Sequence, residues 1–198
     1  MPLKSKLVSR AAGALFGVIA MVVGLNEGRS LVAYPDPVGV WTVCDGETLG
    51  VQPGERRTEA QCDATLRKGI ARHAEALTGL PEALPDVVLI GAVDLTYNIG
   101  EAGFRNSRVY SALLKQDYRT AGDAVLAWRY VSQKAAPAPA LGWTYNTKTK
   151  RWQFDCSQTF NGKRNTVCWG LWERRQWEAK AIGNQFKSVE AALAALPK

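Results

Sequence analysis

The sequence has only one histidine, His73, in 198 residues. Catalytic zinc sites usually need two or three histidines, and a Ser-His-Asp hydrolase would have to use His73 alone, so both enzyme classes are disfavoured. We expect His73 to be solvated, because it lies on a charged helix face. The spacings between the four cysteines, with 17, 93 and 11 intervening residues, match no common zinc pattern.

Acidic residues are missing from the first 26 positions, which carry three basic residues and then an uncharged run over residues 11–25. A basic start followed by an apolar run is the layout of an export signal. No small-x-small cleavage site follows the run, which favours an uncleaved anchor over a cleaved signal peptide. A buried core helix fits the length but not the basic flank. We therefore divide the chain into a signal-anchor/release segment (1–26) and a catalytic domain (27–198).

Long hydrophobic runs are otherwise absent, and this one is short. Fifteen helical residues span about 22 Å, against a hydrocarbon core of about 30 Å. Seven of the fifteen are alanine or glycine, which bury little apolar area. Insertion and later exit from a bilayer are both compatible with these magnitudes. The basic flank would remain in the cytoplasm and place the rest of the chain outside.

The four cysteines form an even set in a chain that is expected to be exported, where disulfides persist. Three pairings are possible, and four free buried thiols are the alternative. Proximity along the chain favours Cys44 with Cys62 and Cys156 with Cys168.

Basic residues outnumber acidic ones by 25 to 18, a net charge of +7. This balance suits an anionic polymer or surface, which could be nucleic acid, lipid or cell wall. Late in the chain, lysine and arginine alternate with aromatic residues in a pattern that also suits single-stranded nucleic acid. Export argues against nucleic acid as the partner. The residues in question are Trp143, Tyr145, Lys148, Lys150, Arg151 and Trp152.

Turn-rich and helical stretches alternate in a way that predicts an α+β fold. Residues 27–52 suggest short strands and turns, and the segment from about 132 to 168 looks like an insertion in a helical lobe, with a hairpin turning near 146–149. Predicted helices cover about 58–77, 85–99, 107–116, 119–130 and 170–182, and a last one begins at Ser188.

Two acids and a threonine follow the apolar run within sixteen residues. Glu27 comes directly after it, Asp36 lies in a turn and Thr42 in a predicted strand. A carboxyl at a helix end and a carboxylate in a facing loop can perform glycoside hydrolysis: one protonates the leaving oxygen, and the other assists water or forms a covalent bond. A nearby hydroxyl can orient the water. Solvated surface residues are the alternative.

Several ordered motifs make the chain resemble phage-type lysozymes, the endolysins of glycoside hydrolase family 24. The resemblance covers residues 27–131 and 169–182. The motifs are Glu27-Gly28, Tyr34-x-Asp36, Gly39-Val40-x-Thr42, Tyr97-Asn98-Ile99-Gly100, Phe104 with Ser107, Ala124 with Trp128, and Gly170-Leu171-x-x-Arg174-Arg175-x-x-Glu178. The apolar start resembles the signal-arrest-release subgroup, in which the first segment tethers an inactive enzyme to the inner membrane and later leaves it.

The resemblance implies a lysozyme-like α+β fold with a small β-hairpin lobe, a larger helical lobe and an N-terminal apolar helix. It implies hydrolysis of the β-1,4 bond between N-acetylmuramic acid and N-acetylglucosamine in peptidoglycan, causing host-cell lysis. Glu27 would be the general acid, Asp36 the carboxylate that assists water or stabilises the sugar cation, and Thr42 the water-orienting hydroxyl. No cofactor or metal is needed. The enzyme would be tethered on the periplasmic side through residues 11–25, then act in the periplasm as a monomer.

Some features depart from the family pattern. Asp45 and Glu47 add acids near the cleft and put the identity of the second carboxylate in question. No cysteine precedes Cys44, so a disulfide-exchange switch in the apolar segment is not expected. The alternatives to a lysozyme are a lytic transglycosylase and a non-enzymatic, membrane-tethered peptidoglycan-binding protein. Arg174 and Arg175 could contact the anionic polymer, although we expect at least one of them to pair with an acid on a neighbouring helix.

Overall fold

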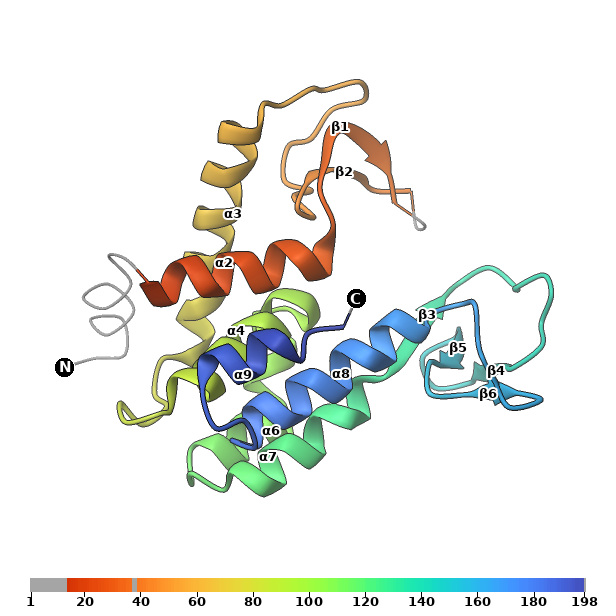
Figure 1. Cartoon of the computed structure of the whole chain (residues 1–198). Coiled ribbons are helices and arrows are strands. Elements are labelled where there is room, and N and C mark those ends of the chain that lie inside the picture. Colours follow the sequence, from red (N-terminus) through yellow and green to blue (C-terminus); the bar gives the residue numbers. More distant parts are fainter. Residues whose placement is uncertain (1–13, 37–38, 198) are drawn as a thin grey trace.

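The computed structural model describes residues 14–36 and 39–197 (Figure 1). The basic flank and the first residues of the uncharged run lie outside this part of the chain. The described part has the expected α+β composition, with a small hairpin lobe beside a larger helical lobe. Within the described residues, no helix combines the length and the apolar character needed to cross a bilayer.

The rest of the uncharged run forms helix α2, Ala14–Glu27, which packs into the main hydrophobic core. Leu15, Ile19, Val22 and Val23 are buried there against side chains of helices α3 and α4. A helix that is apolar around most of its circumference needs such cover in water. The segment that the sequence predicts as an anchor is therefore a structural part of the folded domain.

The small lobe begins directly after α2. Strands β1 (Ser30–Pro35) and β2 (Trp41–Cys44) form an antiparallel hairpin, with Tyr34 opposite Thr42 and Ser30 opposite Cys44. Helix α3 (Glu59–Ala74) starts at a capping box between Thr58 and Gln61, as the sequence predicts.

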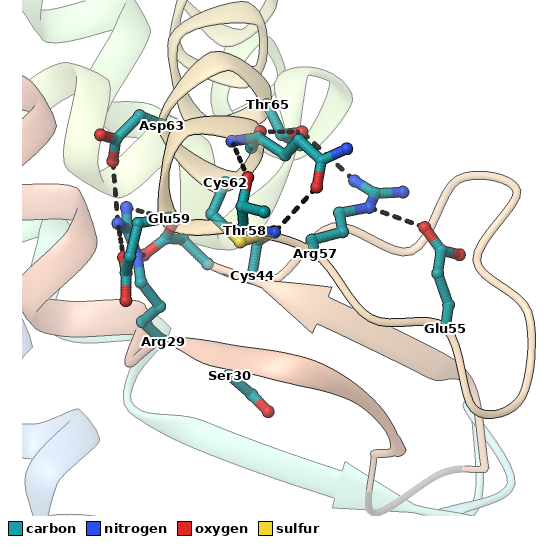
Figure 2. Close-up of a disulfide and its surroundings, with 12 residues drawn as sticks. Arg29, Ser30, Cys44, Glu55, Arg57, Thr58, Glu59, Cys62, Asp63 and Thr65 are labelled. Atoms are coloured by element: carbon teal, nitrogen blue, oxygen red, sulfur yellow. Dashed lines mark hydrogen bonds and ion pairs between the residues drawn. A yellow bond between two sulfur atoms is a disulfide. The ribbon is translucent and has the colours of Figure 1, made fainter.

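The Cys44–Cys62 disulfide joins β2 to the start of α3 (Figure 2). Around it lies a small second core of Ala33, Val43, Val51 and the two cysteines. The hairpin lobe thus has few buried side chains of its own, and its disulfide fastens it to α3.

The helical lobe is built around α4 (Asp86–Ile99) and α8 (Trp169–Ile182), which contact each other closely. Gly91 of α4 permits this approach, since a Cβ there would lie 2.8 Å from the Cβ of Ala181. Gly122 of α7 (Tyr118–Val125) permits a similar approach of α7 to α8, because its Cβ would lie 2.5 Å from the Ala179 carbonyl oxygen. The remaining helical elements are η1 (Glu75–Leu77), α5 (Glu101–Arg105), α6 (Arg108–Leu113), η2 (Leu126–Trp128) and α9 (Val189–Ala194).

Between η2 and α8 the chain forms an insertion at the end of α8, away from α2 and α3 (Figure 1). It contains a three-stranded antiparallel sheet in the order β3-β5-β4 and a short hairpin, β6-β7. The Cys156–Cys168 disulfide closes its second half. Both disulfides pair the cysteines that are nearest along the chain. The strands are β3 (Tyr130–Gln133), β4 (Trp143–Asn146), β5 (Arg151–Asp155), β6 (Thr159–Phe160) and β7 (Lys163–Arg164).

Candidate active site

Glu27 is the last residue of α2, at the junction between the helical lobe and the hairpin. Its Oε1 atom accepts a hydrogen bond from Nη1 of Arg174 at 2.8 Å, across 147 positions of sequence. The side chain remains 19% exposed. The carboxyl is therefore held by the helical lobe while part of it still faces solvent, which an acid that meets a large substrate requires.

Glu27 faces a polar pocket of about 290 Å³. Its walls come from α2, α3, α4 and the loop after β2: Glu27, Gly46, Glu47, Thr48, Arg72, His73, Tyr97 and Asn98. The loop approaches the carboxyl closely, since a Cβ on Gly46 would lie 3.5 Å from Oε2 of Glu27. Gly46 also has a φ of +90°, a conformation that L side chains rarely adopt. A glycine at this position lets the loop form a wall of the pocket.

Tyr97 forms part of the pocket floor and donates a hydrogen bond to the Asp45 carbonyl oxygen at 3.0 Å. Burial, assisted by the negative charges of Glu27, Glu47 and Asp45, raises the pKa of Tyr97 to about 12. The phenol therefore stays a neutral hydrogen-bond donor at physiological pH. It ties the hairpin lobe to α4 beside Glu27.

The expectation that His73 is solvated holds only for its Nε2 side, which lies near Arg72 at the pocket. The His73 ring lies 4.8 Å from the Tyr97 ring, the residue is half-buried, and Nδ1 has no hydrogen-bond partner in the structure. Burial, with a smaller contribution from the Arg72 charge, lowers the pKa of His73. The sequence did not reveal this, because the α3 face that carries His73 is covered by a helix that follows later in the chain.

Asp36 and Thr42 lie together at the other end of the hairpin. The Asp36 N–H and the Thr42 hydroxyl both donate to the Val40 carbonyl oxygen, at 2.9 Å and 3.1 Å. The Asp36 carboxylate accepts the Val40 N–H at 2.8 Å, so the turn holds it. Thr42 is buried and Asp36 is half-buried. Neither residue lines the pocket around Glu27.

The two extra acids near the cleft have different surroundings. Asp45 is only 2% exposed and is bound in a bidentate manner by Arg29, at 3.0 and 2.9 Å. Arg29 also pairs with Glu59 and Asp63 at the start of α3 (Figure 2). Asp45 therefore has a structural partner, which argues against a catalytic role. Glu47 instead lines the pocket.

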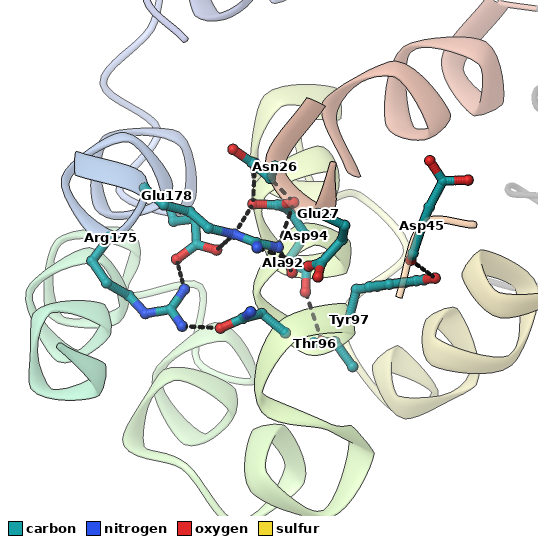
Figure 3. Close-up of polar contacts among 11 residues, drawn as sticks. Asn26, Glu27, Asp45, Ala92, Asp94, Thr96, Tyr97, Arg175 and Glu178 are labelled. Atoms are coloured by element: carbon teal, nitrogen blue, oxygen red, sulfur yellow. Dashed lines mark hydrogen bonds and ion pairs between the residues drawn. The ribbon is translucent and has the colours of Figure 1, made fainter. Parts of the chain in front are cut away.

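Arg174 connects Glu27 to two fully buried carboxyls of the helical lobe, those of Asp94 and Glu178. Figure 3 labels these three acids. The Arg174 guanidinium donates to Asp94 at 3.0 Å and to Glu178 at 3.2 Å. Asn26 holds the other side of Asp94, with its amide nitrogen 3.1 and 3.0 Å from the two carboxylate oxygens. These contacts fix the end of α2 against α4 and α8.

Burial affects the ionisation of this cluster. Desolvation lowers the pKa of Arg174, but the negative charges of Asp94, Glu178 and Glu27 outweigh this and keep the guanidinium charged. Desolvation raises the pKa of Glu178 to about 8, against the opposing effect of Arg175 and Arg174. The cluster therefore places three carboxyls, those of Glu27, Asp94 and Glu178, around two guanidiniums.

Arg175 is buried and donates to Glu178, to the Asn98 side chain and to the Trp128 carbonyl oxygen. The expectation that Arg174 and Arg175 could contact an anionic polymer is therefore wrong, and the expected pairing with an acid on a neighbouring helix is confirmed by Asp94 of α4. Asp94 was not identified from the sequence. Its signal was present, because a single acid within an apolar helix must find a partner when it is buried.

No group of three or more histidine, cysteine, aspartate or glutamate side chains within residues 14–36 and 39–197 could hold a metal ion. The pocket itself offers two carboxyls, a phenol, a hydroxyl, an amide, an imidazole and a guanidinium.

Comparison with known proteins places the fold and the family. Residues 25–141 match the Phage lysozyme family model. The SAR-endolysin of Enterobacteria phage P21 is 34% identical over 110 residues, which cover 54% of this chain and 67% of that protein. The SAR-endolysin of Bacteriophage PS34 is 32% identical over 132 residues, covering 64% and 79%.

Two solved structures share the fold. The endolysin from Escherichia coli O157:H7 phage FAHEc1 has a TM-score of 0.62 at 20% identity and covers 86% of this chain and 93% of that one. The active form of the P1 phage endolysin Lyz has a TM-score of 0.60 at 18% identity, covering 92% of both chains. The matched sequence includes Glu27, Asp36 and Thr42 and more than half of the chain. The chain belongs to the phage lysozyme family.

Proposed function

We propose that the chain is an endolysin that hydrolyses the β-1,4 bond between N-acetylmuramic acid and N-acetylglucosamine in peptidoglycan, with Glu27 as the general acid. In this scheme Glu27 protonates the leaving glycosidic oxygen. Asp36 assists the attacking water or stabilises the positive charge on the sugar, and Thr42 orients that water. The family membership supports a glycoside hydrolase, and the position of Glu27 supports the assignment of the acid.

The observation that carries the proposal is the setting of Glu27. Its carboxyl lies at the junction of the two lobes, with one oxygen bound to Arg174 and the other facing a polar pocket. A general acid needs a fixed position and access to the substrate. The ion pair with Arg174 fixes the position of the Glu27 carboxyl, and its 19% exposure gives the substrate access to it.

The hairpin keeps Asp36 and Thr42 together, although neither lines the Glu27 pocket. Asp36 and Thr42 converge on one carbonyl oxygen, so a carboxylate and a hydroxyl share one end of the hairpin. Glu47 is the competing carboxyl, because it lies in the same pocket as Glu27.

We further propose that the uncharged segment over residues 11–25 first holds the chain on the periplasmic side of the inner membrane and that its exit activates the enzyme in the periplasm. The support is the place of α2 in the core. Asn26 and Glu27 can meet Asp94 and Arg174 only when α2 lies against α4. If α2 lay in the membrane, the core would lack the buried side chains of α2, and Glu27 would lack its ion pair with Arg174.

The catalytic proposal is tested with purified full-length protein and purified cell walls. We expect Glu27→Gln to lower the release of reducing ends by at least about 100-fold, because general acid catalysis contributes roughly 10²–10⁴-fold. Glu59→Gln is the matched control, since Glu59 is 64% exposed and lies outside the pocket. A normal rate of wall lysis by Glu27→Gln would refute the assignment, and anhydro sugars as products would indicate a transglycosylase.

The release proposal is tested with Gly17→Leu. Nothing lies within 4 Å of a Cβ at Gly17 in the folded enzyme, so the substitution leaves room for the folded core. The added apolar area stabilises the inserted helix by about 0.8 kcal/mol for each buried CH₂ group. We expect a larger membrane-bound fraction after cell fractionation and a delayed lysis. An unchanged distribution between membrane and periplasm would contradict the tether.

A further inference from the structure

The insertion between η2 and α8 accounts for the net positive charge of the catalytic domain, residues 27–198. Residues 130–168 contain six basic residues and one acid, Asp155. The remainder of the catalytic domain, residues 27–129 and 169–198, contains 16 basic and 17 acidic residues. A charge asymmetry of this size within one domain is typical of a surface that meets a polyanion. The active-site pocket does not account for it.

The lysines of the insertion are exposed rather than engaged in the packing of the fold. Lys134 follows β3, Lys163 begins β7, and Lys148 and Lys150 lie at the turn between β4 and β5. The turn itself is held by the Asn146 side chain, which accepts the backbone N–H groups of residues 148 and 149 at 3.0 and 3.1 Å. The lysine side chains are therefore free to serve binding without supporting the turn.

One face of the inserted sheet is aromatic. The strand register places Trp143 opposite Phe154, and Tyr145 opposite Trp152, on the same face. The ring centroids of each pair are 5.4 Å apart. Tyr145 remains 49% exposed although it is a large side chain. The opposite face carries polar residues, among them Thr144, Gln153 and Ser132, so the aromatic face is a distinct surface.

A pocket of about 370 Å³ opens on the aromatic face. Trp143 and Phe160 supply partly exposed rings beside the buried Phe154, while Gln133 and Thr166 supply polar groups. Small-molecule sites typically have ~300–1,000 Å³ and combine aromatic walls with a few polar groups. Sugar rings fit such sites because they have an apolar face and a rim of hydroxyl and amide groups.

The insertion is attached beside the catalytic acid. It ends at Cys168, and Arg174, which binds Glu27, follows six residues later, about 9 Å along a helix. It begins just after Trp128, whose carbonyl oxygen accepts a hydrogen bond from Arg175. The base of the insertion thus lies on the helix that positions Glu27, within reach of a polymer several sugar rings long.

We propose that the aromatic face and lysine rim of the insertion form a second glycan-binding site, which holds a carboxylate-bearing amino-sugar chain of the cell wall while another part of that chain occupies the Glu27 pocket. The rings of Trp143, Tyr145 and Trp152 stack on sugar faces. The lysines attract the carboxylates of the stem peptides. This inference rests on the proposed function, because it assumes that the substrate is peptidoglycan.

The first test measures sedimentation of full-length protein with purified cell walls at low salt, in a Glu27→Gln background that keeps the walls intact. We expect Lys148→Glu/Lys150→Glu to weaken binding roughly tenfold, and added salt to reduce this difference. The double variant Lys115→Glu/Lys187→Glu is the matched control, since it makes the same change in net charge at exposed helical-lobe positions. Equal wall binding by both double variants would show that Lys148 and Lys150 do not take part in binding, and it would overturn the role proposed for the lysines.

The second test addresses the pocket. Leu141 lines it and is 69% exposed, so Leu141→Glu places a carboxylate at its mouth without emptying the core. We expect weaker wall binding, whereas Leu114→Glu, at a 45% exposed position of the helical lobe, should bind as the parent does. Wall binding by Leu141→Glu equal to that of the Leu114→Glu control would overturn the pocket as a glycan site.

Two further measurements separate this inference from the catalytic proposal and from a lipid partner. With Glu27 intact, the insertion variants should lose activity on whole walls through a higher KM and retain kcat on short soluble glycan fragments that fill only the Glu27 pocket. If the wild type is active on walls and the insertion variants are equally active, the second glycan site is overturned while the catalytic proposal stands. Co-sedimentation with vesicles of phosphatidylglycerol and phosphatidylethanolamine, without binding to walls, would overturn it in favour of a membrane surface.

Discussion

The two carboxyl groups proposed for catalysis are held in opposite ways. Glu27 is fixed by contacts from the far end of the chain, through Arg174 and the buried carboxyls that surround it. Asp36 is fixed by its own turn, through backbone groups within four residues. The position of the acid therefore depends on complete folding of the helical lobe, whereas that of the second carboxylate depends on a local hairpin.

Among variants that test how Glu27 and Asp36 are held, Arg174→Ala should cause the largest loss of stability and activity. The substitution leaves Asp94 and Glu178 buried without their shared guanidinium, which costs about 3–5 kcal/mol of unfolding free energy. Activity should fall with it, because Glu27 loses its anchor. Urea unfolding measures the first effect and wall lysis the second. Arg164→Ala is the control, since Arg164 is 69% exposed in its pair with Glu173 and should cost less than about 1 kcal/mol. A similar loss of unfolding free energy in both variants would show that Arg174 stabilises the fold no more than an exposed ion pair does.

The next effect concerns the hairpin lobe. Replacing Cys44 and Cys62 by serine opens a loop between residues 18 apart, which should lower stability by about 3 kcal/mol. Local unfolding should increase most in the hairpin that carries Asp36, because the disulfide lies in the small core of that lobe. Hydrogen exchange would show faster exchange in β1 and β2 and little change in α4. Equal loss of protection in both regions would mean that the lobes unfold as one unit.

A third effect separates position from stability at Asp36. Asp36→Asn keeps an oxygen for the Val40 N–H, so stability should change by less than about 1 kcal/mol. Wall hydrolysis should nevertheless fall about 100-fold, because an amide cannot support a cationic sugar as a carboxylate does. Glu47→Gln is the informative partner variant. A large loss with Glu47→Gln and a small one with Asp36→Asn would assign the second carboxylate to Glu47.

The smallest effect involves His73. Its folded pKa is lowered, so the folded protein favours the neutral ring, and the unfolded chain takes up a proton near pH 6.5. Stability should therefore fall as the pH drops below about 6.5. His73→Phe keeps a ring against Tyr97 and removes this loss. The melting temperature should decrease less between pH 7.5 and 5.5 in the variant than in the parent, and an identical decrease would show that His73 does not contribute.

Much of the fold could be predicted because its signals are local. The capping box at Thr58, the proline before α4 and the alternation in β4 and β5 each mark an element from a few neighbouring residues. The short helix α5 and the strands β3, β6 and β7 were not predicted. Each is two to five residues long, too short for a periodic pattern to show.

The site was predicted only in part, for the same reason. Glu27, Asp36 and Thr42 lie within sixteen residues, so a motif can show them. The residues that hold the acid lie in α4 and α8, and their contacts with α2 arise only when the helices pack. The burial of His73 and the pairing of Arg29 with Asp45 likewise depend on side chains that meet through the tertiary structure.

The burial of α2 also limits how the protein can be produced. Trimming the leader up to Asn26, a natural choice for soluble expression, would remove four buried aliphatic side chains at Leu15, Ile19, Val22 and Val23. Each such deletion from a core typically costs about 2–5 kcal/mol, and together they exceed the stability of an ordinary domain. A recombinant form that keeps Ala14–Glu27 and tolerates polar replacements only at exposed positions such as Met21 and Leu25 would be the practical starting point.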